Sequence, residues 1–254
     1  MYREGKVKNK YIYNKNHTIN FTEVGEDAKL NLTSAINLAQ DVTGEYFEEF
    51  ESDNLSLRRK NNAAWVLTKT KVHFEKHPSW KDKVKCESYT TEVKPARVEL
   101  ETTFRDEKDN MLFVIKQEIC PIDVTTRKIK KVKEISYPSD MKIYEEISKE
   151  KFLKLNENFE KKEKVLNQTV YSTDIDFIGH VNNTIYVRYI MNTFDCKFLR
   201  ENEITDFEIH YLHECKENDN LQIYKKENDN KIDFLIKNGE VDSIKAFLIY
   251  KNNR

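Results

Sequence analysis

The order of apolar and polar residues predicts the same set of elements in each half of the chain. In the first half, residues 17–24 alternate as a β-strand does, and Asn31 or Thr33 can cap a helix after it. The apolar residues of this helix recur at helical spacing, at Ile36, Ala39, Val42, Thr43, Tyr46 and Phe47. The polar residues 52–62 are expected to form a loop. Four strand patterns follow, at 66–74, 84–93, 97–104 and 111–122.

The second half repeats this order after a charged segment, 134–159, which reads as a linker with some helix. Residues 164–174 are strand-like, and Asn182 or Asn183 can cap the second helix. Its apolar residues are Ile185, Tyr186, Tyr189, Ile190, Phe194 and Phe198. Strand patterns follow at 204–212, 221–224, 232–236 and 241–250, and Asn238-Gly239 predicts a two-residue hairpin turn between the last two.

The repeated order predicts an α+β fold made of two copies of one unit. Each copy has a helix long enough to cover one face of a curved antiparallel sheet. We expect a first domain over residues 1–140, a linker over 141–162 and a second domain over 163–254. The copies are alike in the order of their elements and not in their sequences.

Composition excludes several classes of protein. Among the 254 residues, 43 Lys and Arg balance 44 Asp and Glu, so the basic surface of a nucleic-acid binder is not expected. With only five glycines, a phosphate-binding loop is not expected. No apolar run is long enough to span a membrane, and residues 1–17 lack the apolar core of a secretory signal, which favours a cytoplasmic protein.

The four cysteines lie far apart in the sequence and form no CxxC pair. Disulfides are not expected in a reducing compartment, and the spacing does not suggest a metal site. We therefore expect neither a metal nor a cofactor.

One segment, 172–186, is dense in chemically active side chains. It holds Asp174, Asp176, His180, Asn182 and Asn183 between a strand and the start of a helix. Amide groups at a helix start can stabilise developing negative charge, a carboxylate can act as base or nucleophile, and histidine can exchange protons near neutral pH. Gly179 permits a tight turn and the close approach of a ligand.

The same residues also have an ordinary interpretation. Asp and Asn are common capping and turn residues, and a lone histidine is more often structural. The matching segment of the first half, 26–31, has no histidine and no such density, so only the second half is expected to be active.

The segment resembles a family signature. DFIGHVNNTIY at 176–186 is similar to the D-x-N-x-H-V-N-N-x-x-Y motif of acyl-[acyl carrier protein] thioesterases. Further resemblances occur in the family's order, at AWVLT (64–68), HPSWKD (77–82), TTRKI (125–129), YLHEC (211–215) and LQ (221–222). They extend over about residues 17–250.

The resemblance implies two tandem hot-dog domains, with the acyl-chain pocket in the first and the active site in the second. The implied reaction hydrolyses fatty acyl-[acyl carrier protein] to free fatty acid and holo acyl carrier protein, in fatty acid biosynthesis. Acyl carrier protein is the implied partner. Monomer and homodimer both remain open, because two hot-dog units in one chain can pair with each other.

Carried over residue by residue, the resemblance assigns catalytic roles to Asp176, His180 and Glu214. Cys215 matches a cysteine once proposed as nucleophile, and Asn182 is a further possible contributor. The family's motif Asn is replaced by Ile178, which cannot form a side-chain hydrogen bond. The segment also resembles single-domain hot-dog acyl-CoA thioesterases, which have an Asp at the position of Asp176 and lack the motif Asn. By that resemblance, the amides of Gly179 and Val181 would polarise the thioester carbonyl.

Several alternatives stay open at this level. The protein could be an acyl-CoA thioesterase, or a non-catalytic acyl-binding protein that keeps the fold. Cys215 could be a small buried residue, and Glu214 a surface carboxylate. The basic run Arg127, Lys128, Lys130, Lys131 and Lys133 could be a solvated strand end or could steer an acidic carrier protein.

Overall fold

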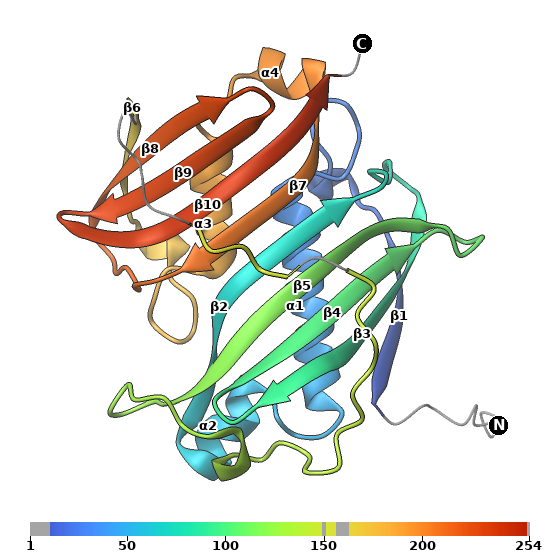
Figure 1. Cartoon of the computed structure of the whole chain (residues 1–254), viewed down its shortest axis with the longest axis vertical. Coiled ribbons are helices and arrows are strands. Elements are labelled where there is room, and N and C mark those ends of the chain that lie inside the picture. The colour runs from blue at the N-terminus through green and yellow to red at the C-terminus, as the bar shows by residue number, and fades with distance from the viewer. Residues whose placement is uncertain (1–10, 149–150, 156–162, 253–254) are drawn as a thin grey trace.

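A curved antiparallel sheet runs through both halves of the chain in the computed structural model, which describes residues 11–148, 151–155 and 163–252 (Figure 1). Its strand order is β1-β3-β4-β5-β2-β7-β10-β9-β8-β6. The first-half strands are β1 (Ile12–Thr18), β2 (Ala63–Phe74), β3 (Lys83–Lys94), β4 (Arg97–Arg105) and β5 (Met111–Asp123). The second-half strands are β6 (Glu163–Thr169), β7 (Asn202–Tyr211), β8 (Asn220–Asn228), β9 (Lys231–Asn238) and β10 (Val241–Asn252).

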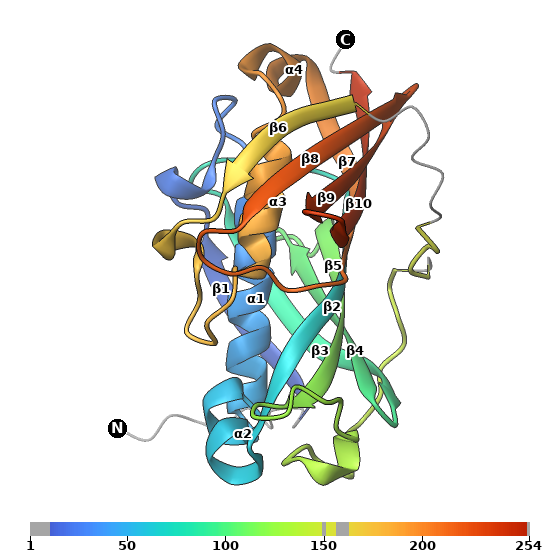
Figure 2. The same ribbon diagram turned by 90° about the vertical axis from the view of Figure 1, so that its left-hand side faces the viewer.

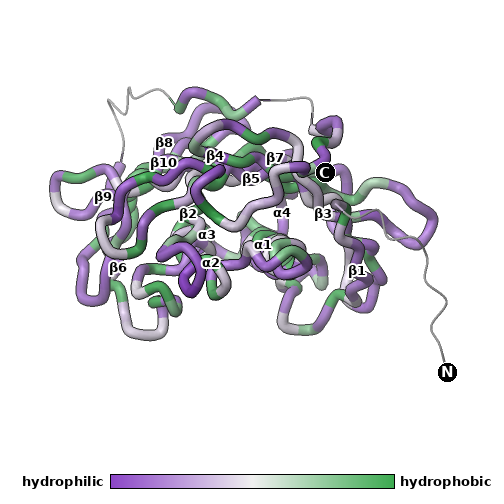
Figure 3. Tube along the Cα trace, turned by 90° about the horizontal axis from the view of Figure 1, so that it is seen from below, coloured by the Kyte–Doolittle hydropathy of each residue, from purple (hydrophilic) through white to green (hydrophobic). Residues whose placement is uncertain are grey.

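The helices gather on one face of this sheet, as Figure 2 shows. They are α1 (Leu32–Glu48), α2 (Asn54–Asn61), α3 (Asn183–Met191) and α4 (Cys196–Glu201), with short 3₁₀ turns at Phe21–Glu23, Val132–Glu134 and Ser172–Asp174. An end view shows α1 and α3 beneath the sheet, with β1 and β6 at its two edges (Figure 3). In the described part of the chain, no helix combines the length and apolar character needed to cross a membrane.

The predicted α+β class and its repeated order are confirmed. Asn31 caps α1 by accepting a hydrogen bond from Ser34 N–H, and the apolar stripe of α1 is buried against the sheet. Full burial of a large apolar side chain of that stripe, such as Ile36 or Val42, contributes roughly 1.5–3 kcal/mol. The predicted strand 17–24 is misplaced: β1 spans Ile12–Thr18, and a 3₁₀ turn follows it. The predicted strand 164–174 ends earlier, at Thr169, because a 3₁₀ turn follows there too. The predicted domain boundaries stay a prediction.

Two local predictions are wrong. Part of the predicted loop 52–62 is α2, because Asp53 caps it and the fully buried Leu57 anchors an otherwise polar helix. The second long helix does not reach Phe198: α3 ends at Met191, where the Thr193 hydroxyl donates to Ile190 O at 2.7 Å. A separate helix, α4, begins at Cys196.

The hairpin between β9 and β10 exists, but its turn is displaced by one residue. Asn238 pairs with Val241, so the two loop residues are Gly239 and Glu240. Gly239 has a φ of +59°, which suits glycine at the first loop position.

The linker crosses the face of the sheet opposite the helices (Figure 2), and its described part contains no helix, contrary to prediction. Buried carboxylates hold its backbone instead. Glu101 of β4 accepts from the amides of Ile147 (2.7 Å) and Ser148 (2.9 Å), and Glu208 of β7 accepts from Leu153 N–H (2.8 Å). The predicted linker residues 149–150 and 156–162 lie outside the described residues.

The two halves are joined where β2 pairs with β7, from Lys69 opposite His210 to His73 opposite Asp206. On the helix side, one hydrophobic cluster contains residues from both halves, among them Phe113 and Phe207, and α1 contacts α3. Interactions across β2 and β7 therefore hold the halves together.

His73 and Asp206 form such an interaction, with Nδ1 of His73 2.7 Å from Oδ1 of Asp206. Partial burial acts to lower the pKa of His73, but the hydrogen bond and charge of Asp206, with Glu75, outweigh it and raise the pKa. The stabilisation is therefore complete below the ordinary pKa of histidine and is lost as pH rises through the raised value.

We predict that Asp206→Asn lowers the free energy of unfolding by about 0.5 kcal/mol near pH 6, and by less at pH 9, because a smaller fraction of His73 is protonated there. Denaturant unfolding at both pH values measures the difference. Asp233→Asn is the matched control, because it removes a carboxylate paired with a lysine, Lys231 of the same strand, instead of a histidine. An Asp206→Asn effect that is equal at both pH values would contradict the assignment.

Candidate active site

Asp174 anchors the segment that carries the predicted site. Its side chain is 2% exposed and accepts from the hydroxyl of Tyr189 (2.6 Å), Nη2 of Arg188 (2.5 Å) and the amide of Tyr171 (2.9 Å). Burial acts to raise the pKa of Asp174, but these hydrogen bonds and the Arg188 charge lower it. A buried, ionised and fully bonded carboxylate suits a structural role, fixing the loop to α3.

The loop after Asp174 is a short closed turn. Asp176 N–H donates to His180 O, and Gly179 N–H donates to Asp176 O, both at 2.9 Å. Gly179 has a φ of +92°, which L side chains rarely adopt. Oδ1 of Asp176 accepts from Ile178 N–H at 2.9 Å, whereas Oδ2 makes no hydrogen bond with a described residue. One carboxylate oxygen is therefore fixed and the other is available.

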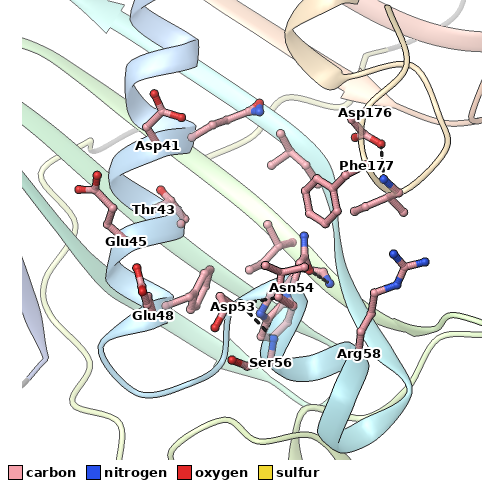
Figure 4. A pocket seen from close by; sticks show the side chains of 18 of the residues that line it. Asp41, Thr43, Glu45, Glu48, Asp53, Asn54, Ser56, Arg58, Asp176 and Phe177 are labelled. Atoms are coloured by element: carbon pink, nitrogen blue, oxygen red, sulfur yellow. Dashed lines mark hydrogen bonds between the residues drawn. The ribbon is translucent and has the colours of Figure 1, made fainter. Parts of the chain in front are cut away.

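Asp176 faces a cleft of about 1220 Å³ between the second-half loop and the first-half helices (Figure 4). Asp176, Phe177 and Ile178 line one side, and residues of α1 and α2 line the other. The apolar part of the lining is Phe47, Trp65, Leu67 and Ile119. The site therefore lies between the two halves and belongs to neither alone.

Aromatic side chains shape this cleft. Phe47 stacks on Trp65, with ring centroids 5.4 Å apart, and Nε1 of Trp65 donates to Ser52 O at 2.8 Å. Phe177 and Leu55 also line the cleft, although each is more than 60% exposed. Figure 4 shows the ring of Phe177 directed into the space between the loop and α1. These side chains offer an apolar path from Asp176 toward α2.

His180 and Glu214 lie beside the loop, and neither lines the cleft. Nε2 of His180 is 3.1 Å from Oε2 of Glu214, and Arg127 from the first half donates to Oε1 of Glu214. Nδ1 of His180 is buried without a partner among the described residues. Among the three predicted residues, side chains interact only between His180 and Glu214 in the described structure. Asp176 is linked to His180 through a backbone hydrogen bond.

Cys215 is fully buried, and burial raises its pKa. Its Sγ lies 3.4 Å from Oγ of Ser243, and its amide donates to the hydroxyl of Tyr186 at 3.1 Å. A buried thiol with a raised pKa carries little reactive thiolate. The interpretation as a small packing residue fits this environment better than a nucleophile.

The amides proposed to polarise a carbonyl are occupied. Gly179 N–H donates to Asp176 O, and Val181 N–H donates to Cys215 O at 3.1 Å. Asn182 caps α3, with its Oδ1 accepting from Thr184 N–H at 3.0 Å. The amide of Asn183, the first residue of α3, has no partner among the described residues, and Asn183 lines the cleft. The Asn183 amide is therefore better placed than those of Gly179 and Val181 to donate a hydrogen bond into the cleft.

The first half contains a structural copy of the loop. Gly25 N–H donates to Lys29 O (2.9 Å), and Ala28 N–H donates to Gly25 O (3.0 Å), as Asp176, His180 and Gly179 do in the second half. Gly25 therefore occupies the position of Asp176, and Lys29 that of His180. The copy keeps the backbone hydrogen bonds, but it has no carboxylate at the position of Asp176 and no imidazole at the position of His180.

The resemblance implied an acyl-chain pocket in the first half, but sequence reasoning did not identify the first-half residues that line the cleft. Gln40, Thr43 and Gln117 line the cleft together with Asp176, yet they lie more than 50 residues away in sequence. No local pattern singles them out. Among the described residues, no group of three His, Cys, Asp or Glu side chains could hold a metal ion.

Comparisons with known proteins agree with this geometry. The family model of the acyl-ACP thioesterase N-terminal domain matches residues 10–138, and that of the C-terminal domain matches residues 156–251. The crystal structure of an acyl-ACP thioesterase from Bacteroides thetaiotaomicron is 20% identical, with a TM-score of 0.80 over 96% of this chain and 99% of that one. The 12:0-ACP thioesterase from Umbellularia californica is 20% identical, with a TM-score of 0.77 over 95% and 94%.

A curated relative, the chloroplastic oleoyl-acyl carrier protein thioesterase of Coriandrum sativum, is 20% identical over 228 residues. The match covers 82% of this chain, but the chain spans only 60% of the length of that relative. The solved structures establish the tandem hot-dog fold, and the two family models together cover most of both halves. The chain belongs to the acyl-ACP thioesterase family.

Proposed function

We propose that this protein hydrolyses fatty acyl-[acyl carrier protein] to free fatty acid and holo acyl carrier protein, as a step of fatty acid biosynthesis. The observation that carries the proposal is the position of Asp176: a carboxylate with one unbonded oxygen at the edge of a cleft with apolar side chains. A thioesterase needs both, an acyl-chain site and a base or nucleophile at its end.

In the proposed reaction, Asp176 takes a proton from water, and the resulting hydroxide attacks the thioester carbonyl carbon. The carbon–sulfur bond then breaks, and the proton passes to the departing pantetheine thiolate. Direct attack by Asp176, followed by hydrolysis of the anhydride, gives the same products. In both routes Ile178 N–H holds Oδ1 and leaves Oδ2 to act.

The oxyanion of the tetrahedral intermediate needs a hydrogen-bond donor. We assign this role to the amide of Asn183, since those of Gly179 and Val181 are engaged in the loop. The positive end of α3 supports the same charge.

His180 and Glu214 are proposed as positioning residues. Arg127 holds Glu214, Glu214 orients the His180 ring, and the backbone of His180 holds Asp176 through its carbonyl oxygen. The chain of contacts links the end of β5 to the catalytic loop, so it couples the two halves at the active site.

Three lysines of the basic run support a carrier protein as partner. Lys128, Lys131 and Lys133 are exposed and form no ion pair with a described residue. By contrast, Arg127 pairs with Glu214, and Lys130 pairs with Asp123. The three exposed lysines lie close in sequence to Arg127, which pairs with the positioning residue Glu214. An acidic carrier would be steered to this surface.

The four cysteines are free, which suits the proposed cytoplasmic location.

We predict that Asp176→Asn lowers kcat for acyl carrier protein thioesters at least 100-fold, because the amide is neither a base nor a nucleophile. Thiol release from a chain-length panel on acyl carrier protein and on CoA measures the loss. Asp27→Asn is the matched control, since Asp27 lies in the first-half copy of the loop. Turnover of Asp176→Asn close to wild type would remove Asp176 from the mechanism, and no turnover by folded wild type would favour acyl binding without catalysis.

We predict that Lys128→Glu combined with Lys131→Glu raises KM for acyl carrier protein thioesters about tenfold at low salt, because rim charges act on association. KM for acyl-CoA should change less, and added salt should shrink the effect. The control pair, Lys164→Glu with Lys197→Glu, reverses two exposed charges on β6 and α4. Equal effects of the two pairs would argue against a docking surface.

A further inference from the structure

A band of buried polar side chains crosses the inner face of the first-half sheet. It consists of Ser88 on β3, Thr102 on β4, Gln117 on β5 and Thr70 on β2, with Thr43 of α1 above it. Ser88 lies opposite Thr102, and Thr70 opposite Gln117, in the strand register. Each of the four strand side chains is at most 3% exposed. We refer to these five residues as the polar band.

The polar band divides the hydrophobic interior. On the strands, the inward-facing residues before and after the band belong to two separate apolar clusters. On one side lie Val72, Phe104 and Ile115, and on the other Leu67, Leu100 and Ile119. A row of buried polar groups is costly between two apolar clusters unless its hydrogen bonds are made.

The hydrogen bonds of the band are incomplete. Thr43 donates to Oε1 of Gln117 at 2.9 Å, but the Nε2 of Gln117 has no partner among the described residues. The Thr70 hydroxyl is buried and faces that of Tyr211, and neither residue lines the cleft. Oε1 of Gln40, one turn before Thr43 on α1, is likewise buried without a described partner.

The cleft opens onto this part of the band. Gln40, Thr43 and Gln117 line it together with Asp176. Figure 4 shows Thr43 on α1 across the cleft from Asp176, with Asp53 and Ser56 below it. An acyl chain whose thioester lies at Asp176 would therefore share the cleft with Gln40, Thr43 and Gln117 as well as with Phe47 and Trp65.

An unsubstituted chain covers the carboxamides of Gln117 and Gln40 without offering them a partner. We propose that the cleft is built for acyl chains that carry a hydroxyl or oxo oxygen near the thioester, and that Gln117 recognises this oxygen. The N–H groups of Gln117 donate to it, and a hydroxyl can donate in turn to one of the unpartnered oxygens. This inference rests on the proposed function and names its substrate class.

Discrimination of this kind can be strong. A site that hydrogen-bonds a substrate hydroxyl rejects the analogue lacking it, whereas an apolar pocket rejects an added hydroxyl only weakly. Selectivity for the oxygenated chain should therefore depend on Gln117, and on Thr43, which lines the cleft and donates to Gln117.

The first test compares acyl carrier protein thioesters of one chain length that are unsubstituted, 3-hydroxy, 3-oxo or ω-hydroxy. We expect kcat/KM for a 3-oxygenated chain to exceed that for the unsubstituted and ω-hydroxy chains at least tenfold. The ratio should fall to about one in Gln117→Leu and decrease in Thr43→Val, which removes the hydrogen bond to Gln117. Thr103→Val is the matched control: Thr103 is also buried, but it lies next to Thr102 on the other face of β4.

The second test measures binding, and it does not require turnover. The free fatty acid and its 3-hydroxy analogue are titrated against Trp80→Phe protein, and binding is followed by tryptophan fluorescence. In this variant the signal comes from Trp65 alone, which lines the cleft. We expect tighter binding of the hydroxy acid, lost in Gln117→Leu. If no thioester is hydrolysed but this preference holds, the proposed function fails and the recognition stands. A preference for the unsubstituted chain, or one unaffected by Gln117→Leu, overturns the inference.

Discussion

The pairing of β2 with β7 is the contact on which the site depends. It joins two hot-dog units edge to edge, so that one sheet passes through both and α1 lies against α3. The second-half loop that carries Asp176 consequently lies over a cleft whose other walls are α1 and α2 of the first half. Neither unit alone would place Asp176 beside this cleft.

The two loops separate backbone architecture from chemistry. Both close with the same hydrogen bonds and both pass through a left-handed residue, Ala28 in the first half and Gly179 in the second. The frame is therefore a property of the fold, and function enters through the side chains placed on it. In the second half, the Asp174 side chain fixes the loop to α3. The Asp176 side chain therefore makes one hydrogen bond within the loop, from Ile178 N–H.

Polar groups are buried on both faces of the sheet for different reasons. On the outer face, Glu101 and Glu208 are covered by the linker, and their hydrogen bonds to its backbone fix its course. On the inner face, the polar band leaves donors and acceptors unsatisfied where the cleft meets it. Most buried polar groups in proteins are hydrogen-bonded, so unsatisfied ones beside a cleft call for an explanation, and a ligand atom is the one proposed above.

The sequence by itself determined the strands, α1, the repeated order and the loop that carries Asp176, because apolar periodicity and capping residues act over a few positions. It misjudged α2 and the end of α3, where single contacts of Leu57 and Thr193 outweigh local composition. Only the tertiary structure decided that the amides of Gly179 and Val181 are occupied and which residues of the first half line the cleft. Those facts depend on hydrogen bonds and packing between segments distant in sequence, which no local pattern encodes.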